Sequence, residues 1–92
     1  MIRSFRSKPL RQLFEHDDPS KLSVPNVARV QRILERLAIA LEPSDMNQPG
    51  MRFHALKGSG KGRYAVDASG NWRITFAWSD EDAIDVDLED YH

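Results

Sequence analysis

Residues 72–78 read Trp-Arg-Ile-Thr-Phe-Ala-Trp, and this stretch decides the fold. Large apolar side chains occupy every second position, and arginine, threonine and alanine stand between them. A period of two is typical of a β-strand with one face in a core, and β-branched and aromatic residues favour strands. The stretch therefore predicts the central strand of a sheet, whose core face consists of Trp72, Ile74, Phe76 and Trp78.

Alternation of apolar and polar side chains recurs in three further segments: residues 52–56, 63–68 and 84–88. The glycine-rich residues 57–62 predict a loop, and Ser-Gly-Asn at 69–71 predicts a hairpin turn. Residues 1–5 are short and partly apolar, and they predict an edge or return strand. In the last strand Ile84, Val86 and Leu88 alternate with Asp85 and Asp87, which predicts that the three apolar side chains share one face.

Helical periodicity appears in two stretches ahead of these strands. Residues 8–15 have apolar side chains at i, i+3 and i+4, which is the spacing of one helix face. A second, longer helix is expected to begin near Ser23 and Pro25, because serine can cap a helix and proline suits its first turn. Pro43 is expected to end this helix. Its apolar stripe is Val27, Val30, Leu34, Leu37 and Leu41.

One strand, two helices and three or four hairpin-connected strands predict an α+β domain that spans residues 1–92. Both helices are expected on one face of a small, mainly antiparallel, twisted sheet. The stripe of the longer helix and the apolar face of the central strand then bury each other. The opposite face, with His54 and Arg73, is left exposed, and we expect the chemistry there.

Composition narrows the class of protein. The 92 residues include no cysteine, so disulfides and thiolate metal sites are excluded and a reducing cytosol is the natural compartment. No apolar run approaches the roughly 20 residues that cross a bilayer, so no membrane association is expected. Residues 1–15 mix charged and apolar side chains and lack the apolar stretch of a signal peptide.

The formal net charge of −1 hides a strong division along the chain. Residues 1–76 hold all 13 lysines and arginines against 7 acidic residues, a net charge of +6. Residues 77–92 hold the other 7 acidic residues and no lysine or arginine. Fields act within a Debye length of about 8–10 Å, so this division predicts local effects. It indicates either a basic face that binds a polyanion or an acidic last strand that neutralises its basic neighbours.

Several common site motifs do not occur. Residues 58–62 read GSGKG, but a nucleotide-binding loop needs G-x-x-x-x-G-K-[ST], and a glycine follows Lys61. The segment predicts a flexible loop in which Lys57 and Lys61 can contact a polyanion as point charges. The three histidines are far apart in the sequence, and no spacing indicates a metal site. No G-x-S-x-G nucleophile motif is present.

A different set of residues points to phosphodiester chemistry. His54 taken alone is better explained as a structural histidine at a sheet surface. Together with Arg73 and the final Asp90-Tyr91-His92, it supplies an acid–base imidazole, a fixed cation, a carboxylate and a phenol. Cleavage of a phosphodiester needs groups that take a proton, give a proton and stabilise negative charge. These residues are therefore the parts that cleavage of a phosphodiester needs.

The strings that contain these residues also resemble a known family. They are MIRSF at 1–5, Pro-Gly at 49–50, FHALKG at 53–58, GNWRITF at 70–76 and DVDLEDYH at 85–92. With them the chain resembles, almost from end to end, the HigB branch of the RelE-type toxins of bacterial toxin–antitoxin pairs. GNWRITF and DVDLEDYH are the most specific strings, and the helices alone would identify nothing.

The resemblance implies a RelE-like fold and a cytoplasmic endonuclease that cleaves messenger RNA in the 30S A site of the ribosome. It also implies a helix-turn-helix antitoxin of the HigA type as partner, and neither a cofactor nor a metal. By position it assigns the catalytic groups to His54, Asp90, Tyr91 and His92, with Lys57 and Arg73 as basic helpers. The 2′-hydroxyl of the RNA would attack the adjacent phosphorus, and which imidazole acts as acid and which as base stays open.

Three arginines on the polar side of the longer helix are candidates for contact with ribosomal RNA: Arg29, Arg32 and Arg36. They fit a solvated helix face equally well. Two other functions are compatible with the scaffold. One is inhibition of DNA gyrase, as in the ParE branch, which needs no acid–base set, so the Asp90-Tyr91-His92 ending argues against it. The other is a non-enzymatic module that binds nucleic acid or an antitoxin through its basic face.

Overall fold

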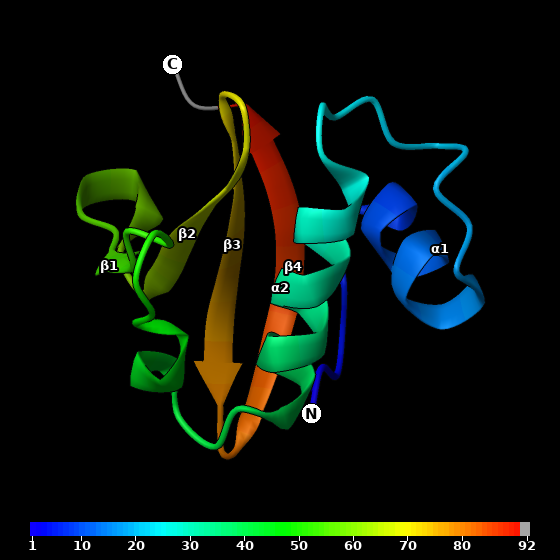
Figure 1. Ribbon diagram of the computed structural model, residues 1–92. Helices are drawn as coiled ribbons and strands as arrows, with labels where there is room; N and C mark the ends of the chain where they lie inside the picture. Colours follow the sequence, from blue (N-terminus) through cyan, green and yellow to red (C-terminus); the bar gives the residue numbers. More distant parts are fainter. Residues whose placement is uncertain (91–92) are drawn as a thin grey trace.

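A four-stranded antiparallel sheet forms one layer of the molecule, and two helices cover one of its faces (Figure 1). The computed structural model describes residues 1–90. The sheet order, β1-β2-β3-β4, follows the sequence, and this arrangement confirms the predicted α+β class. The elements are α1 (Lys8–His16), α2 (Val27–Ile39), the 3₁₀ turn η1 (Pro43–Met46), β1 (His54–Ala55), the 3₁₀ turn η2 (Gly58–Gly60), β2 (Arg63–Ser69), β3 (Trp72–Ser79) and β4 (Asp82–Asp90).

The core lies between α2 and the sheet, where β3 supplies Ile74 and Phe76, both fully buried. The helix contributes a buried stripe that consists of Val30, Ile33, Leu34 and Leu37. Trp72 and Trp78, which we expected on the same face, are half-buried because they lie toward the two ends of the strand. Neither helix of residues 1–90 has the length and apolarity that a membrane-spanning segment needs.

The boundaries of α2 differ from the prediction. Asn26, and not Ser23, caps the helix, because its side-chain oxygen accepts a hydrogen bond of 3.0 Å from the backbone N–H of Arg29. The helix ends at Ile39, and Leu41 is 76% exposed. The spacing predicts Leu41 in the buried stripe, and this prediction is wrong because the helix ends two residues before Leu41. Ile33 lies in the stripe instead.

Residues 1–5 run parallel to β4, as the predicted return segment. They form two isolated bridges, Ile2 with Ala83 and Phe5 with Val86, and do not form a continuous strand. The connection between residues 5 and 82 includes both helices and three strands, which gives the chain the length to return in a parallel direction. The pairing places the N-terminal segment beside the edge of β4 (Figure 1).

β4 contains a β-bulge that interrupts its alternation. Thr75 pairs with Asp87, but Ala77 pairs with Ile84, so β4 has one more residue than β3 between these pairs. Asp85 takes up the extra residue with a positive φ of 50°. Ile84 consequently shares the outer face with Ala77 and does not pack on the core. The prediction that Ile84, Val86 and Leu88 share one face was wrong for Ile84.

The bulge predicts that alanine substitutions at Val86 and Ile84 differ in their effect on stability, which regular alternation would not predict. Val86 is fully buried, so Val86→Ala is expected to lower the free energy of unfolding by about 2 kcal/mol through lost burial and an unfilled cavity. Ile84→Ala is expected to cost clearly less, although it removes more carbon atoms, because Ile84 is only half-buried. Urea unfolding of both variants measures the difference. An equal or greater loss for Ile84→Ala would contradict the bulged register.

Candidate active site

The sheet face opposite the helices contains a basic hollow of about 260 Å³. β2, β3 and β4 supply its floor, and the loop after β1 and the N-terminal segment supply its walls. It is lined by Arg6, Leu56, Lys57, Ser59, Gly60, Arg63, Arg73 and Glu89. Cross-strand partners in an antiparallel sheet point to the same side, and the registers place the arginines of β2 and β3 with Glu89 on this open face.

Thr75 lies at the centre of the open face and is fully buried. Its hydroxyl donates a short hydrogen bond to one carboxylate oxygen of Glu89. The same hydroxyl accepts a hydrogen bond of 2.9 Å from Nη2 of Arg63. The other carboxylate oxygen of Glu89 lies 3.8 Å from Nη2 of Arg73. A buried threonine therefore joins side chains from three strands, and the open face is less exposed than the sequence predicted.

Arg63 is the most strongly perturbed cation of the hollow. Nη2 also donates to the backbone oxygen of Asp85 at 2.8 Å, so two neutral acceptors hold the guanidinium. Burial lowers the pKa of Arg63, and the nearby charge of Arg6 lowers it further, against the opposing effect of Glu89 and other carboxylates. Arginine stays protonated at physiological pH despite such shifts. The hollow therefore holds a charged arginine although burial and a neighbouring positive charge disfavour its charged form.

His54 lies on the same sheet face as the hollow but does not line it. It pairs with Ala65, which pairs in turn with Thr75, so two strand spacings, about 10 Å, separate His54 from the central threonine. The side chain is exposed, and its Nδ1 lies 2.9 Å from the backbone oxygen of Arg52. A carbonyl oxygen only accepts, so Nδ1 donates and Nε2 is left for exchange of a proton with a ligand.

The loop after β1 holds Lys57 at the wall of the hollow. β1 is only two residues long, shorter than the predicted strand at 52–56, because Arg52 has a positive φ of 51° and η2 begins at residue 58. Gly60 folds back onto Leu56 so closely that a Cβ at Gly60 would lie 2.9 Å from the Cβ of Leu56. Lys61 follows this turn, is exposed and does not line the hollow.

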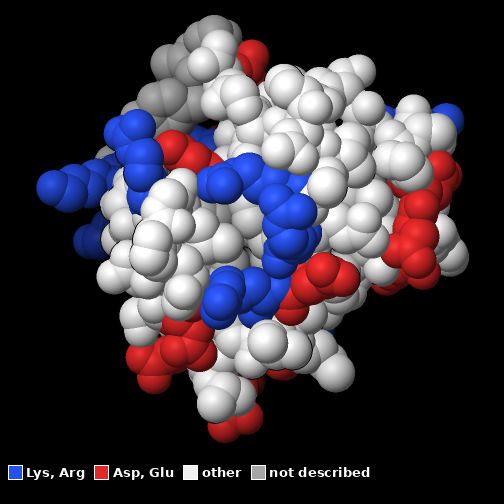
Figure 2. All heavy atoms as spheres, viewed as in Figure 1, with Lys and Arg blue, Asp and Glu red and all other residues white. Residues whose placement is uncertain are grey.

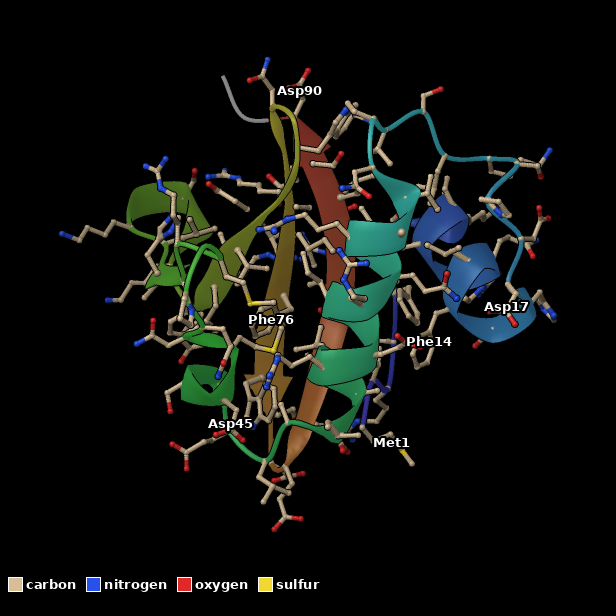
Figure 3. All side chains as sticks on the ribbon, viewed as in Figure 1. Met1, Phe14, Asp17, Asp45, Phe76 and Asp90 are labelled. Atoms are coloured by element: carbon tan, nitrogen blue, oxygen red, sulfur yellow. The ribbon has the colours of Figure 1, made fainter. Side chains whose placement is uncertain are left out.

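The C-terminal residues of the predicted site are only partly described. Asp90 ends β4 next to the β2–β3 hairpin and pairs with Trp72, so its register places it on the other sheet face from Glu89 (Figure 3). Tyr91 and His92 lie outside the described residues. Glu89 was not selected from the sequence, because an acidic residue in an acidic strand gives no signal until its neighbours are known.

The three arginines of α2 belong to the helix-covered side. Figure 2 shows basic side chains gathered over α2 in this view. Arg29 is bound within the fold, because its Nη2 donates to the backbone oxygen of Gly50 at 2.9 Å. Arg32 and Arg36 are exposed. The structure therefore does not bring these arginines together with His54 and Arg73.

Sequence reasoning missed Arg6, Arg63 and Thr75 as well as Glu89. The alternation of β2 could have placed Arg63 on the open face, but only the return of the N-terminal segment brings Arg6 to the hollow. As for metals, residues 1–90 contain no group of three histidine or acidic side chains arranged to hold an ion.

Comparison with known proteins identifies the class of protein as a toxin of a toxin–antitoxin system. A family model described as the RelE-like toxin of the type II toxin–antitoxin system HigB matches residues 3–92, and the chain belongs to this family. The chain is 36% identical over 92 residues to the "Endoribonuclease HigB" of Proteus vulgaris, covering 100% of both proteins. It is 32% identical over 91 residues to the "Toxin HigB-1" of Vibrio cholerae serotype O1, covering 97% of this chain and 96% of that protein. The predicted resemblance is confirmed.

The hydroxyl of Thr75 is expected to stabilise the open face measurably. Thr75→Val keeps the shape but removes one of the two acceptors of Arg63 Nη2 and the hydroxyl donor of Glu89, which should lower the free energy of unfolding by about 1–3 kcal/mol. Thr75→Ser keeps the hydroxyl and is the matched control. Urea unfolding tests both variants. A valine variant as stable as the serine variant would show that the hydrogen bonds contribute nothing.

Proposed function

We propose that the chain is an endoribonuclease toxin that cuts messenger RNA in the ribosomal 30S A site. The observation that carries the proposal is a histidine and a basic hollow on one open sheet face, in a family with a relative named an endoribonuclease. Three cations of the hollow, Lys57, Arg63 and Arg73, suit a polyanionic substrate.

In the proposed reaction the RNA supplies its own nucleophile. The 2′-oxygen bonds to the adjacent phosphorus as its proton passes to a base, and the bond from phosphorus to the 5′-oxygen breaks as that oxygen receives a proton from an acid. The products are a 2′,3′-cyclic phosphate and a 5′-hydroxyl, so no water and no redox partner is consumed. His54 and His92 divide the two proton transfers, since imidazole has an ordinary pKa of about 6.5, near working pH.

The remaining site residues support this reaction in the proposal. Arg73 and Lys57 stabilise the negative charge that develops on the phosphorane oxygens, which is often the largest contribution to catalysis. Asp90 orients one imidazole or accepts a proton, and Tyr91 stacks on a base, an interaction worth about 1–3 kcal/mol.

Partners follow from the family and the proposed substrate. A type II toxin has an antitoxin, and we assign a helix-turn-helix protein of the HigA type to this role in the bacterial cytoplasm. The ribosome would hold the message in line for attack, a proximity effect that suits a protein with few catalytic groups. Lys61 and the α2 arginines, Arg29, Arg32 and Arg36, would meet ribosomal RNA phosphates.

Purified ribosomes programmed with a defined message give the decisive test. We expect cleavage within the A-site codon, with a 2′,3′-cyclic phosphate at the new end, and no cleavage of the same message without ribosomes. Inhibition of DNA gyrase without cleavage would replace the proposal by a gyrase toxin. Binding to ribosomes with neither activity would leave a non-enzymatic module.

The two imidazoles can be tested separately in this assay. His54→Ala and His92→Ala should each lower the cleavage rate by about 10²–10⁴, the usual contribution of a positioned acid or base. His16→Ala is the control, because His16 is an exposed histidine at the end of α1. If both variants stayed within about threefold of the control, well inside that range, the assignment would be wrong.

A further inference from the structure

Two arginines that no proposed catalytic step uses border the hollow. Arg6 comes from the N-terminal segment, where its backbone N–H donates to the oxygen of Val86 at 2.8 Å, and Arg63 begins β2. Arg63 pairs with Ala77, which lies four residues along β3 from Arg73, about 13 Å at the usual rise per residue. The Arg63 side chain reaches back along this face to the hydroxyl of Thr75 at 2.9 Å, so Arg73 lies on one side of the Thr75–Glu89 pair and Arg63, with Arg6 near it, lies on the other.

Neither arginine has an ion-pair partner within the described part of the chain, although the nearby charges of Glu89, Asp87 and Asp85 act to raise the pKa of Arg63. No carboxylate forms an ion pair with Arg6 or Arg63 there, and the two bonds of Arg63 Nη2 go to a hydroxyl and a carbonyl, which are neutral. Burial lowers the pKa of Arg63 most, and repulsion by the like charge of Arg6 lowers it further. An anion between them would reverse this cost.

Arg63 also has hydrogen-bonding capacity to spare. Its Nε and Nη1 are shielded from solvent and have no acceptor among residues 1–90. Shielded donors without a partner destabilise a fold, and most such groups in proteins are satisfied by a partner or a ligand. Arg63 also lines the hollow, so an oxygen-rich anion there would lie beside a guanidinium whose donors are not all satisfied.

The charge of the whole lining identifies the class of ligand. Four cations, Arg6, Lys57, Arg63 and Arg73, face a single carboxylate, Glu89, so the lining has a net charge of +3. A single phosphodiester has one negative charge and would leave most of this charge uncompensated. A strand with successive phosphates along the hollow compensates it more completely, and guanidinium groups match phosphate oxygens with two parallel hydrogen bonds.

We propose that Arg6 and Arg63 form a second phosphate-binding subsite, which holds the RNA phosphate next to the one that is cleaved. This inference rests on the proposed function for the identity of the strand, but the subsite itself needs only binding. It assigns to Arg6 and Arg63 the positioning of the strand, while Arg73 and Lys57 face the reacting phosphate. Two fixed phosphates define the direction of the strand across the sheet and hence which 2′-hydroxyl reaches the imidazoles.

The test uses RNA oligonucleotides with 2′-O-methyl groups, which lack the nucleophile and cannot be cleaved. In one set, a neutral methylphosphonate replaces each phosphate in turn. In wild type, one such replacement beside the cleavage position should weaken binding at low ionic strength by about 10-fold, the effect expected for a charged hydrogen bond. In Arg6→Gln and in Arg63→Gln, the all-phosphate strand should bind about 10-fold more weakly, and that replacement should have less than about twofold further effect.

Controls separate binding from folding. Arg11→Gln removes an exposed arginine of α1 and should leave the affinity unchanged. Arg63→Gln removes a half-buried side chain, so urea unfolding must show that it is folded; the exposed Arg6 gives a variant without this concern. The slope of log affinity against log salt should also fall by about 0.7 for each arginine removed.

The outcomes distinguish this subsite from the proposed function. The subsite is overturned if both glutamine variants bind within twofold of wild type, if the methylphosphonate effect is the same with and without the arginines, or if wild type binds no oligonucleotide. If wild type cuts the message on programmed ribosomes and any one of these three results is found, the subsite alone is overturned. If the methylphosphonate effect is lost in the glutamine variants as expected but the protein cuts no message, the endoribonuclease proposal is overturned and the subsite stands.

Discussion

Burial of Ile74 and Phe76 beneath α2 is the constraint on which the rest of the structure depends. A strand has two faces, so this apolar contact also decides what lies on the other side of β3. Arg73 and Thr75 must point away from the helices, on the same face as their cross-strand neighbours in β2 and β4. The site is thus a consequence of core packing: the hydrophobic effect orients the strand, and the polar groups between the apolar ones meet on the open face.

Charged side chains on the open face form specific ion pairs and hydrogen bonds. The acidic last strand neutralises part of the basic body, since Asp82 lies 3.6 Å from Arg3 and Glu89 lies 3.8 Å from Arg73. Neutralisation of basic neighbours by the acidic last strand is therefore confirmed for Arg3 and Arg73, and a basic face that binds a polyanion stays a prediction. Arg6 and Arg63 stay outside these pairs, and buried hydrogen bonds through Thr75 fix one of them in place. Such a network holds cations close together although they repel.

At particular residues the tertiary structure differs from the prediction made from the sequence. Alternation assigned Ile84 to the face of Val86 and Leu88, but the bulge at Asp85 turns it outward, and one extra residue suffices because the side-chain period is two. Spacing extended the stripe of α2 to Leu41, but the helix ends before it. The family resemblance selected His54, Lys57 and Arg73 by position, yet nothing local marks Glu89.

The sequence by itself determined the two helices, the three long strands, the apolar face of β3 and the family, because periodicity and short sequence motifs are local properties of neighbouring residues. Only the tertiary structure decided that the N-terminal segment returns beside β4 and brings Arg6 to Arg63, and that Thr75 joins the two sides of the hollow. Such contacts join residues up to about a whole chain length apart. Their free energy depends on distance and burial in space, which no local pattern of side chains encodes.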